Sequence, residues 1–177
     1  ASFTFDLVRG FLNKPWSLME CTPSQVNWHE ICQLKRPGMH MLSCVQALAH
    51  GSDTAMMFQW RKSRGGPEKF HGAVVGHDMT NRTRTFKEVK ATGELLEALS
   101  ELVHSETKSD VALIFDQANR WALDGAQGPR KDKDYFGVTF DHYRALSRAG
   151  VNVDVIDMEK PFDSYKLLVA PYLYMLK

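Results

Sequence analysis

The hydrophobic residues of this chain alternate between short continuous runs and longer runs with helical spacing. Residues 16–19 and 54–60 have the length and apolar character of buried strands. Residues 39–50 and 85–104 place apolar side chains three or four positions apart, which is typical of amphipathic helices. A shorter helix is predicted for residues 3–12. Because strands alternate with helices, the pattern predicts βαβ units with parallel strands and therefore an α/β fold.

A second α/β segment follows the short polar stretch at residues 105–109, which has no apolar periodicity and is the best candidate for a domain boundary. We therefore divide the chain into residues 1–107 and 108–177. The second part is predicted to contain a turn-rich loop at residues 125–134 and the following elements: strands at 111–115, 151–156 and 167–170, and a helix at 135–149.

Composition and charge exclude several classes of protein. The chain has 177 residues, of which 44% are hydrophobic and 24% charged, as in ordinary globular domains. Its formal net charge is +1 and no long block of one sign appears, so neither nucleic acid nor a membrane surface is expected as a partner. No run approaches the length of a transmembrane helix, and the first residues lack a signal-peptide pattern.

The three cysteines, Cys21, Cys32 and Cys44, do not suggest a metal site by their spacing. There is no Cys-x-x-Cys motif, and no close pair of Cys and His with the spacing of a zinc site is apparent. We interpret all three as small buried hydrophobic side chains. The sequence thus predicts no metal and no cofactor, and the odd number of thiols favours a reducing, cytoplasmic location.

Glu20 is the most conspicuous candidate for chemistry. It directly follows the strand predicted at residues 16–19 and precedes the turn-forming sequence Thr22-Pro23-Ser24. Ligands of parallel α/β folds bind at the carboxyl ends of the strands, where barrel enzymes also place catalytic side chains. An isolated Glu at such a position is more often simply solvated, so the pattern alone leaves both interpretations open.

The residues around Glu20 resemble the nucleophile segment of the glycoside hydrolase family 42 β-galactosidases. The segment that carries the resemblance is LMECTPSQVNW, residues 18–28. Further matching blocks follow in the same order: FQWR at 58–61, SRGGPEKFHG at 63–72, SDVALIFD at 109–116, DVI at 154–156 and YKLLVAP at 165–171. The resemblance therefore covers essentially the whole chain.

This resemblance implies a specific architecture and assembly. Residues 1–107 correspond to the last two β/α units of a TIM (β/α)₈ barrel, and residues 108–177 to the start of a flavodoxin-like, doubly wound domain that mediates trimerisation. A complete barrel needs about 250 residues, so the chain corresponds to only part of the family's architecture. The expected partners are a galactoside substrate and further copies of the chain in a homotrimer.

The resemblance also assigns roles to particular residues. Retaining glycosidases use one carboxylate as nucleophile and a second carboxyl as acid. Glu20 falls on the nucleophile position, while Trp28, Phe58, Glu68 and His71 match positions that line the galactose subsite. The family's general acid belongs to an Asn-Glu pair that this chain does not contain, and its cysteine zinc cluster also lies earlier in the sequence. We therefore expect the chain by itself to be inactive.

Plainer interpretations of these residues remain open. Phe58 is nearly as well explained by core packing, because it lies within a predicted strand. Glu68 and His71 share one ligand only if their glycine-rich loop opens a helical turn, and are otherwise a surface carboxylate and a capping imidazole. Arg61 and Arg64 either neutralise charge near Glu20 or solvate a loop.

A phosphate-binding loop around Arg64 is disfavoured because neither G-x-x-x-x-G-K-[ST] nor G-x-G-x-x-G is present. A non-catalytic folding or oligomerisation unit is the alternative function.

Overall fold

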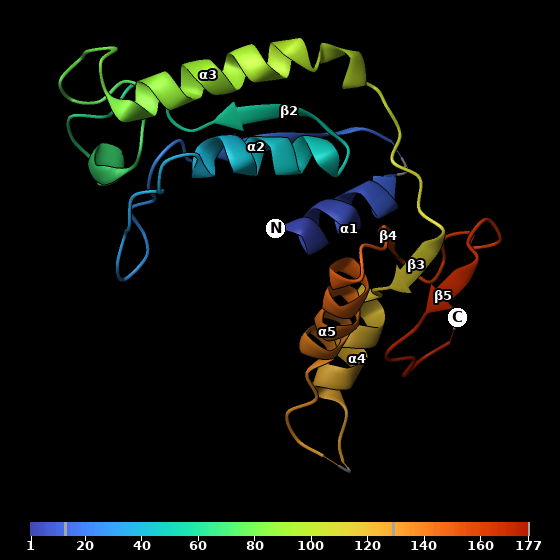
Figure 1. Ribbon diagram of the computed structural model, residues 1–177. Helices are drawn as coiled ribbons and strands as arrows, with labels where there is room; N and C mark the ends of the chain where they lie inside the picture. Colours follow the sequence, from blue (N-terminus) through green and yellow to red (C-terminus); the bar gives the residue numbers. More distant parts are fainter. Residues whose placement is uncertain (13, 129, 177) are drawn as a thin grey trace. The chain divides into compact units, whose positions relative to one another are not determined.

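The computed structural model describes residues 1–12, 14–128 and 130–176 and has the expected α/β fold (Figure 1). Its elements group into two compact units, one formed by Pro15–Ser105 and the other by Ala1–Lys14 together with Glu106–Lys177. Within the described residues, no helix is both long and apolar enough to cross a membrane.

The unit formed by Pro15–Ser105 contains a βαβ arrangement. Strands β1 (Trp16–Cys21) and β2 (Ser52–Met57) pair in parallel, and helix α2 (Met39–Ala49) connects them. Helix α2 packs against β2 and against α3 (Arg84–Ala98), which the short 3-10 helix η2 (Ser100–Leu102) follows. The predicted alternation of strand, helix and strand is thus confirmed.

Local signals in the sequence explain where these helices begin. The α3 helix starts after Thr83, whose hydroxyl accepts a hydrogen bond from the Phe86 backbone N–H at 3.2 Å, as an N-cap should. Before α2, Gly38 has a φ of 79°, a left-handed conformation that glycine adopts without a steric penalty. Gly93 lies inside α3 without ending it.

The ends of both strands differ from the predicted ones. Strand β1 extends through Cys21, which pairs with Met57, so Glu20 lies within the strand and not just after it. Strand β2 ends at Met57, so the prediction that places Phe58 inside this strand is wrong. Pairing with β1 does not continue to Gln59, because the Gln59 backbone N–H donates to the carbonyl of Gly72, which lies outside the sheet.

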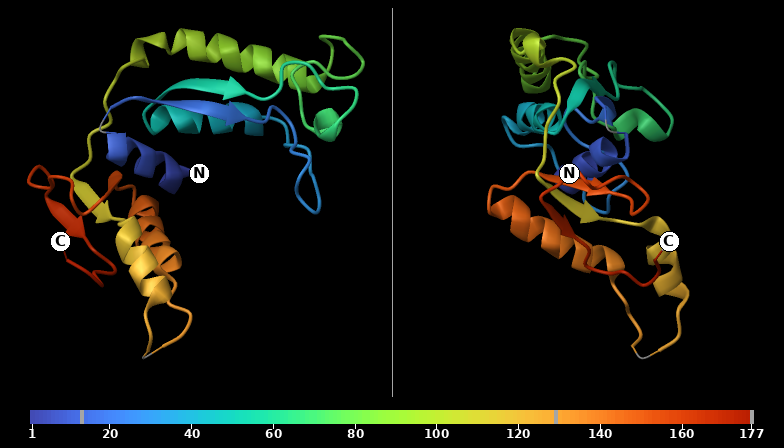
Figure 2. Two further views of the ribbon diagram at one scale, coloured as in Figure 1. Left: turned by 180° about the vertical axis from the view of Figure 1, so that it is seen from behind. Right: turned by 90° about the vertical axis from the view of Figure 1, so that its right-hand side faces the viewer.

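The other unit is built on a three-stranded parallel sheet with the strand order β4-β3-β5 (Figure 2). The strands are β3 (Val111–Ile114), β4 (Val153–Ile156) and β5 (Leu167–Val169), and helix α5 (Tyr135–Arg148) contacts β3 and β4. The largest core cluster of the described residues lies here: Phe3, Val111, Leu113, Phe115, Leu123, Tyr135, Tyr143, Val153 and Val155. All three predicted strands and the predicted helix are therefore present.

Helix α1 (Ser2–Leu12) belongs to this second unit and packs against β4. Its buried residues are Phe3, Asp6 and Arg9, whereas Phe11 and Leu12 of the predicted apolar face are exposed. Arg9 donates to the Asp154 carboxylate at 3.0 and 2.8 Å and pairs with Asp6 at 2.7 Å. The helix is therefore held by a buried ionic network as well as by apolar packing.

One helix is absent from the sequence-based prediction. Helix α4 (Gln117–Gly125) follows Asp116, whose buried carboxylate accepts a hydrogen bond from the Asn119 backbone N–H at 2.6 Å. It is short and mostly polar, and Leu123 is its one buried apolar side chain. Its N-cap residue was the available signal, because aspartate is among the preferred residues at that position.

Candidate functional site

The loops that follow β1 and β2 are joined by backbone hydrogen bonds. The Phe58 N–H donates to the Cys21 carbonyl at 3.1 Å, and the Gly72 N–H donates to the Gln25 carbonyl at 2.8 Å. Glu20 is exposed and lies one residue before Cys21. The structure therefore brings the segment after Glu20 together with the segments that carry Phe58 and His71, at the carboxyl end of a parallel strand pair.

Gly72 permits this close approach. A Cβ atom at this position would lie 2.4 Å from the Ser24 hydroxyl oxygen and 2.8 Å from the backbone N and O of Gln25. Any side chain at residue 72 would force the two loops apart. The glycine thus fixes the distance between the loop after β1 and the segment that contains His71.

Glu68 lies in the 3-10 helix η1 (Pro67–Phe70), so the helical turn required by the sequence analysis is present. Its carboxylate accepts a hydrogen bond from the Asn27 side-chain amide at 3.2 Å, and the same amide donates to the Pro67 carbonyl at 2.6 Å. The Gln59 amide donates to the Glu68 backbone carbonyl at 3.1 Å. Neither Asn27 nor Gln59 was singled out as an orienting residue, although both lie inside the matching sequence blocks. A carboxylate accepts several hydrogen bonds, so Glu68 retains capacity for hydroxyl donors.

His71 is buried, with 4% of its surface exposed, and its ring meets the Phe58 ring edge to face at a centroid distance of 5.0 Å. Its Nδ1 lies 2.9 Å from the Gly72 carbonyl. Because a carbonyl only accepts, Nδ1 must carry the proton, which leaves Nε2 of the neutral ring as an acceptor. The structure therefore places Phe58 and His71 in direct contact.

The two aromatic candidates are both accessible. Phe58 follows β2 and is 36% exposed, while Trp28 is 70% exposed and packs its ring on His29 at a centroid distance of 4.1 Å. Aromatic faces stack on the C–H surfaces of sugar rings while excluding water from them. Within the described residues, Trp28 makes no aromatic ring contact with Phe58 or His71.

The basic residues of the loop after β2 line a shallow hollow. Arg61, Lys62 and Arg64 form it together with His77 and Met79, and the Arg61 Nε lies 3.4 Å from the Met79 sulfur. Arg61 and Arg64 are exposed, which agrees with a solvated loop.

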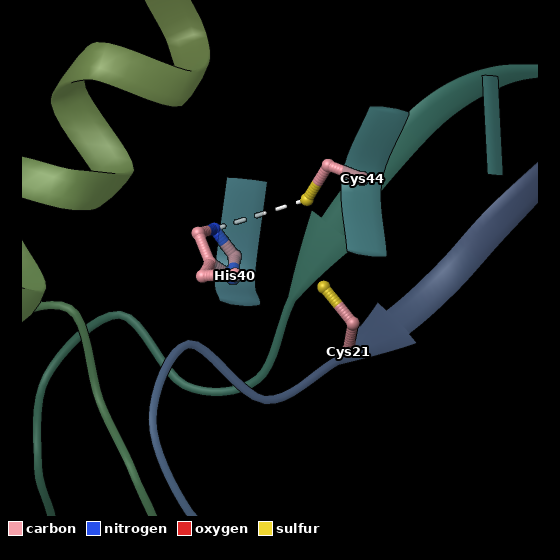
Figure 3. Close-up of side chains that lie close together, drawn as sticks. All are labelled: Cys21, His40 and Cys44. Carbon is pink, nitrogen blue, oxygen red and sulfur yellow. Dashed lines mark hydrogen bonds between the residues drawn. The ribbon is translucent and has the colours of Figure 1, made fainter. Parts of the chain in front are cut away.

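A second group of reactive side chains lies beside Glu20 and is formed by Cys21, His40 and Cys44 (Figure 3). Cys21 ends β1, whereas His40 and Cys44 project from α2, one helical turn apart. The prediction that no close pair of Cys and His has the spacing of a metal site is therefore wrong, since a four-residue spacing on a helix puts the His40 and Cys44 side chains on one face. The prediction that all three cysteines are buried is also wrong, because Cys32 is exposed and Cys21 is intermediate.

Electrostatics distinguish the members of this group. The neighbouring Cys44 thiol lowers the pKa of Cys21 to about 7, and the Cys21 thiol raises the pKa of Cys44. The nearby Lys35 ammonium favours both thiolates. Burial, followed by the Lys35 charge, lowers the pKa of His40. The imidazole is therefore neutral at neutral pH, which is the form that binds metals.

Two family models together match nearly the whole chain. The model described as beta-galactosidase, of glycoside hydrolase family 42, matches residues 1–99. The model described as the beta-galactosidase trimerisation domain of the same family matches residues 109–177.

Individual relatives agree with these matches. A β-galactosidase of Alicyclobacillus acidocaldarius is 54% identical over 97% of this chain and 25% of its own length. A β-galactosidase of Bacillus licheniformis is 53% identical over 98% of this chain and 26% of its own length. The chain thus spans about a quarter of the length of these curated relatives.

Solved structures show the same similarity. The β-galactosidase of Rahnella sp. R3 matches with a TM-score of 0.94 and 48% identity, over 99% of this chain and 26% of its own. The β-galactosidase of Bacillus circulans sp. alkalophilus matches with a TM-score of 0.94 and 38% identity, over 99% of this chain and 27% of its own.

Proposed function

This chain belongs to the β-galactosidases of glycoside hydrolase family 42, and we propose that it is the part of a retaining β-galactosidase that carries the nucleophile and one side of the galactose subsite. In this proposal residues 1–107 form the C-terminal part of the catalytic barrel, including its last two β/α units. Residues 108–177 begin the flavodoxin-like trimerisation domain. The separate family matches to residues 1–99 and 109–177 support this division.

The observation that carries the proposal is the position of Glu20. Its carboxylate is exposed near the carboxyl end of β1, within a parallel pair whose two following loops are joined by hydrogen bonds. This is the edge at which parallel α/β enzymes place their catalytic groups. A carboxylate at that edge is able to attack an electrophilic carbon.

The proposed reaction is a double displacement at the anomeric carbon of a terminal β-galactoside. The Glu20 carboxylate attacks this carbon while a carboxylic acid, supplied by a part of the enzyme outside this chain, protonates the leaving oxygen. In retaining enzymes the two carboxyl groups lie about 5 to 5.5 Å apart. Water then releases galactose from the glycosyl ester with net retention, and the second carboxyl acts as the base in that step.

The remaining residues bind the sugar in this proposal. The Glu68 carboxylate, held by the Asn27 amide, accepts hydrogen bonds from galactose hydroxyls. The Nε2 atom of His71 accepts a further one, because the Gly72 carbonyl keeps the ring proton on Nδ1. Phe58, which supports the His71 ring, and Trp28 provide apolar surface for the sugar's C–H faces.

The decisive experiment replaces Glu20 with Gln in the complete enzyme that contains this segment. We expect kcat on an aryl β-galactoside to fall by at least about 10³-fold, because an amide is a poor nucleophile, with the fold unchanged. Glu30→Gln is the matched control, since Glu30 is an exposed carboxylate in the loop after β1 and is expected to keep wild-type turnover.

Two further measurements locate the covalent bond. A 2-deoxy-2-fluoro-galactosyl donor, which slows hydrolysis of the intermediate, is expected to add one sugar to the peptide that contains Glu20. The first product seen by NMR is expected to be the β-anomer. Wild-type turnover by Glu20→Gln, a label on another peptide, or an inverted product would each refute the assignment.

We also propose that the complete enzyme is a homotrimer assembled through the domain that residues 108–177 begin. The match of residues 109–177 to a trimerisation-domain model supports this. Light scattering of the complete enzyme is expected to give three times the mass of one chain. A monomer that retains full activity would contradict the proposed assembly while leaving the proposed chemistry intact.

A further inference from the structure

Three soft ligand atoms converge beside the proposed nucleophile. One atom each from Cys21, His40 and Cys44 lies within 4.8 Å of the other two, and Figure 3 shows all three side chains pointing toward a common centre. The distance between the His40 Nε2 and the Cys44 Sγ is 3.8 Å. In a tetrahedral zinc site, Zn–S bonds of about 2.3 Å and Zn–N bonds of about 2.0 to 2.1 Å place two such atoms about 3.6 Å apart. The observed separation is therefore close to that of a metal site.

We propose that Cys21, His40 and Cys44 bind one Zn²⁺ ion, with water at the fourth position. Two thiolates and one imidazole are a donor set that zinc prefers over the hard cations Mg²⁺ and Ca²⁺, which take oxygen ligands. Two thiolates also neutralise the charge of the ion. Binding releases two protons from the thiols, and the nearby Lys35 ammonium favours that deprotonation.

The burial of His40 provides an independent observation. Its side chain is fully buried, and its Nδ1 is the one buried side-chain polar atom without a hydrogen-bond partner among the described residues. A buried polar group without a hydrogen-bond partner destabilises the folded state. Ligating histidines typically donate their other ring N–H to a carbonyl or carboxylate, and the Thr22 carbonyl already lies close to this ring. Ligation through Nε2 would fix the proton on Nδ1 and align it with that carbonyl.

The site has a structural consequence for Glu20. Cys21 follows Glu20 directly and ends β1, whereas both other ligands come from the first turns of α2. The three ligands thus connect the end of the strand to the helix. A bound ion would therefore connect the backbone beside Glu20 to α2.

The experiment uses the reduced 177-residue chain, so that no ligands from other parts of a longer protein contribute. Co²⁺ serves as the spectroscopic probe, because thiolate ligation gives an intense sulfur-to-cobalt charge-transfer band, and Zn²⁺ is then added to displace it. We compare the wild type with Cys21→Ser and Cys44→Ser. Cys32→Ser is the matched control, because this exposed thiol donates to the His29 carbonyl outside the cluster.

We expect one equivalent of Co²⁺ per wild-type chain, with the charge-transfer band, and displacement by Zn²⁺. Cys21→Ser and Cys44→Ser should each weaken binding at least about tenfold, whereas Cys32→Ser should bind like the wild type. Zn²⁺ should also protect the partly exposed Cys21, and not Cys32, from alkylation by iodoacetamide. The proposal is overturned if the reduced wild type binds no metal, if either serine variant retains wild-type affinity, or if Cys32→Ser loses affinity equally.

Discussion

Strand β3 of one unit and strands β1 and β2 of the other differ in how well the described chain covers them. All four residues of β3 are buried, because β4 and β5 flank this strand and α5 packs against it. In β1 only Trp16 is buried, and in β2 only Ser52. Met19 of β1 is 70% exposed and Met56 of β2 is 41% exposed. The unit around β3 therefore makes its own core, whereas the unit around β1 and β2 leaves apolar surface for other parts of a protein to cover.

The largest expected effect concerns the 177-residue chain by itself. We predict that it hydrolyses no aryl β-galactoside at a measurable rate and self-associates in solution. General acid catalysis contributes about 10² to 10⁴-fold, and the acid of the proposed mechanism lies outside this chain. The uncovered apolar surface of β1 and β2, which form a two-stranded sheet, favours association with other chains.

Turnover assays and light scattering on the purified chain test both parts. A stable monomer of 20.1 kDa that turns over substrate would show that the acid residue lies within the chain. The remaining part of the enzyme can also be added as a second polypeptide. Restored activity would support the proposal that this part covers β1 and β2 and supplies the acid carboxyl.

A pair of alanine substitutions measures the difference between the two sheets. Leu113→Ala in β3 removes a side chain that is fully buried in the core and is expected to cost about 2 to 5 kcal/mol of unfolding free energy. Met19→Ala in β1 removes a mostly exposed side chain and is expected to change the stability of the chain by less than about 0.5 kcal/mol. Denaturant unfolding at one fixed protein concentration measures both values.

The same pair of substitutions in the complete enzyme sharpens the test. If the rest of the protein covers β1, Met19→Ala should become clearly destabilising there, while the cost of Leu113→Ala should change little. An equally small cost of Met19→Ala in both contexts would mean that this face of β1 remains in solvent.

Two glycine substitutions test packing in each unit. In Gly10→Ala on α1, the new Cβ would lie 2.1 Å from the Val155 carbonyl oxygen, so β4 or the helix must move, and we expect a loss of about 3 kcal/mol. Gly93→Ala on α3 meets nothing within 4 Å in the middle of a helix, and should stabilise by about 0.5 to 1 kcal/mol. Thermal unfolding measures whether each substitution lowers or raises stability. A Gly10→Ala variant as stable as the wild type would exclude the close contact of α1 with β4.

Much of this fold follows from hydrophobic periodicity. The strand in 111–115 and the helix in 135–149 were predicted correctly because their surroundings bury them as the pattern requires. Helix α1 was predicted, but its buried face was not, since burial of Arg9 depends on Asp154, which lies 145 residues away in sequence. The end of β2 at Met57 likewise depends on a hydrogen bond to Gly72.

The candidate site shows the same limit. Phe58 contacts His71 and the Asn27 amide donates to Glu68, whereas the roles of these residues in sugar binding stay a prediction. The Cys21, His40 and Cys44 cluster was missed because its members come from a strand and a helix. The two members on α2, His40 and Cys44, are four residues apart, and this spacing was recognisable in the sequence. The approach of Cys21 to that pair depends on the packing of α2 against the strands, which spacing alone does not give.

The remaining expected effect depends on pH and concerns Tyr165 in the unit around β3. Its hydroxyl donates to the Asp154 carboxylate at 2.9 Å, and burial, followed by the Asp154 charge, raises its pKa from the ordinary value of 10.0 to about 12. The folded state therefore keeps this proton between about pH 10 and about pH 12 while the unfolded chain loses it, so this group's contribution to stability is complete below about pH 10 and declines as the pH rises.

Tyr165→Phe is expected to cost about 1 kcal/mol near neutral pH and progressively less toward pH 12. Tyr174→Phe, at a side chain that is 54% exposed, is the control and should leave stability unchanged at both ends of the range. Denaturant unfolding followed by circular dichroism at about pH 8 and about pH 11 tests the sign. A loss of stability in Tyr165→Phe that grows with pH would contradict the role given to the hydrogen bond from the Tyr165 hydroxyl to Asp154.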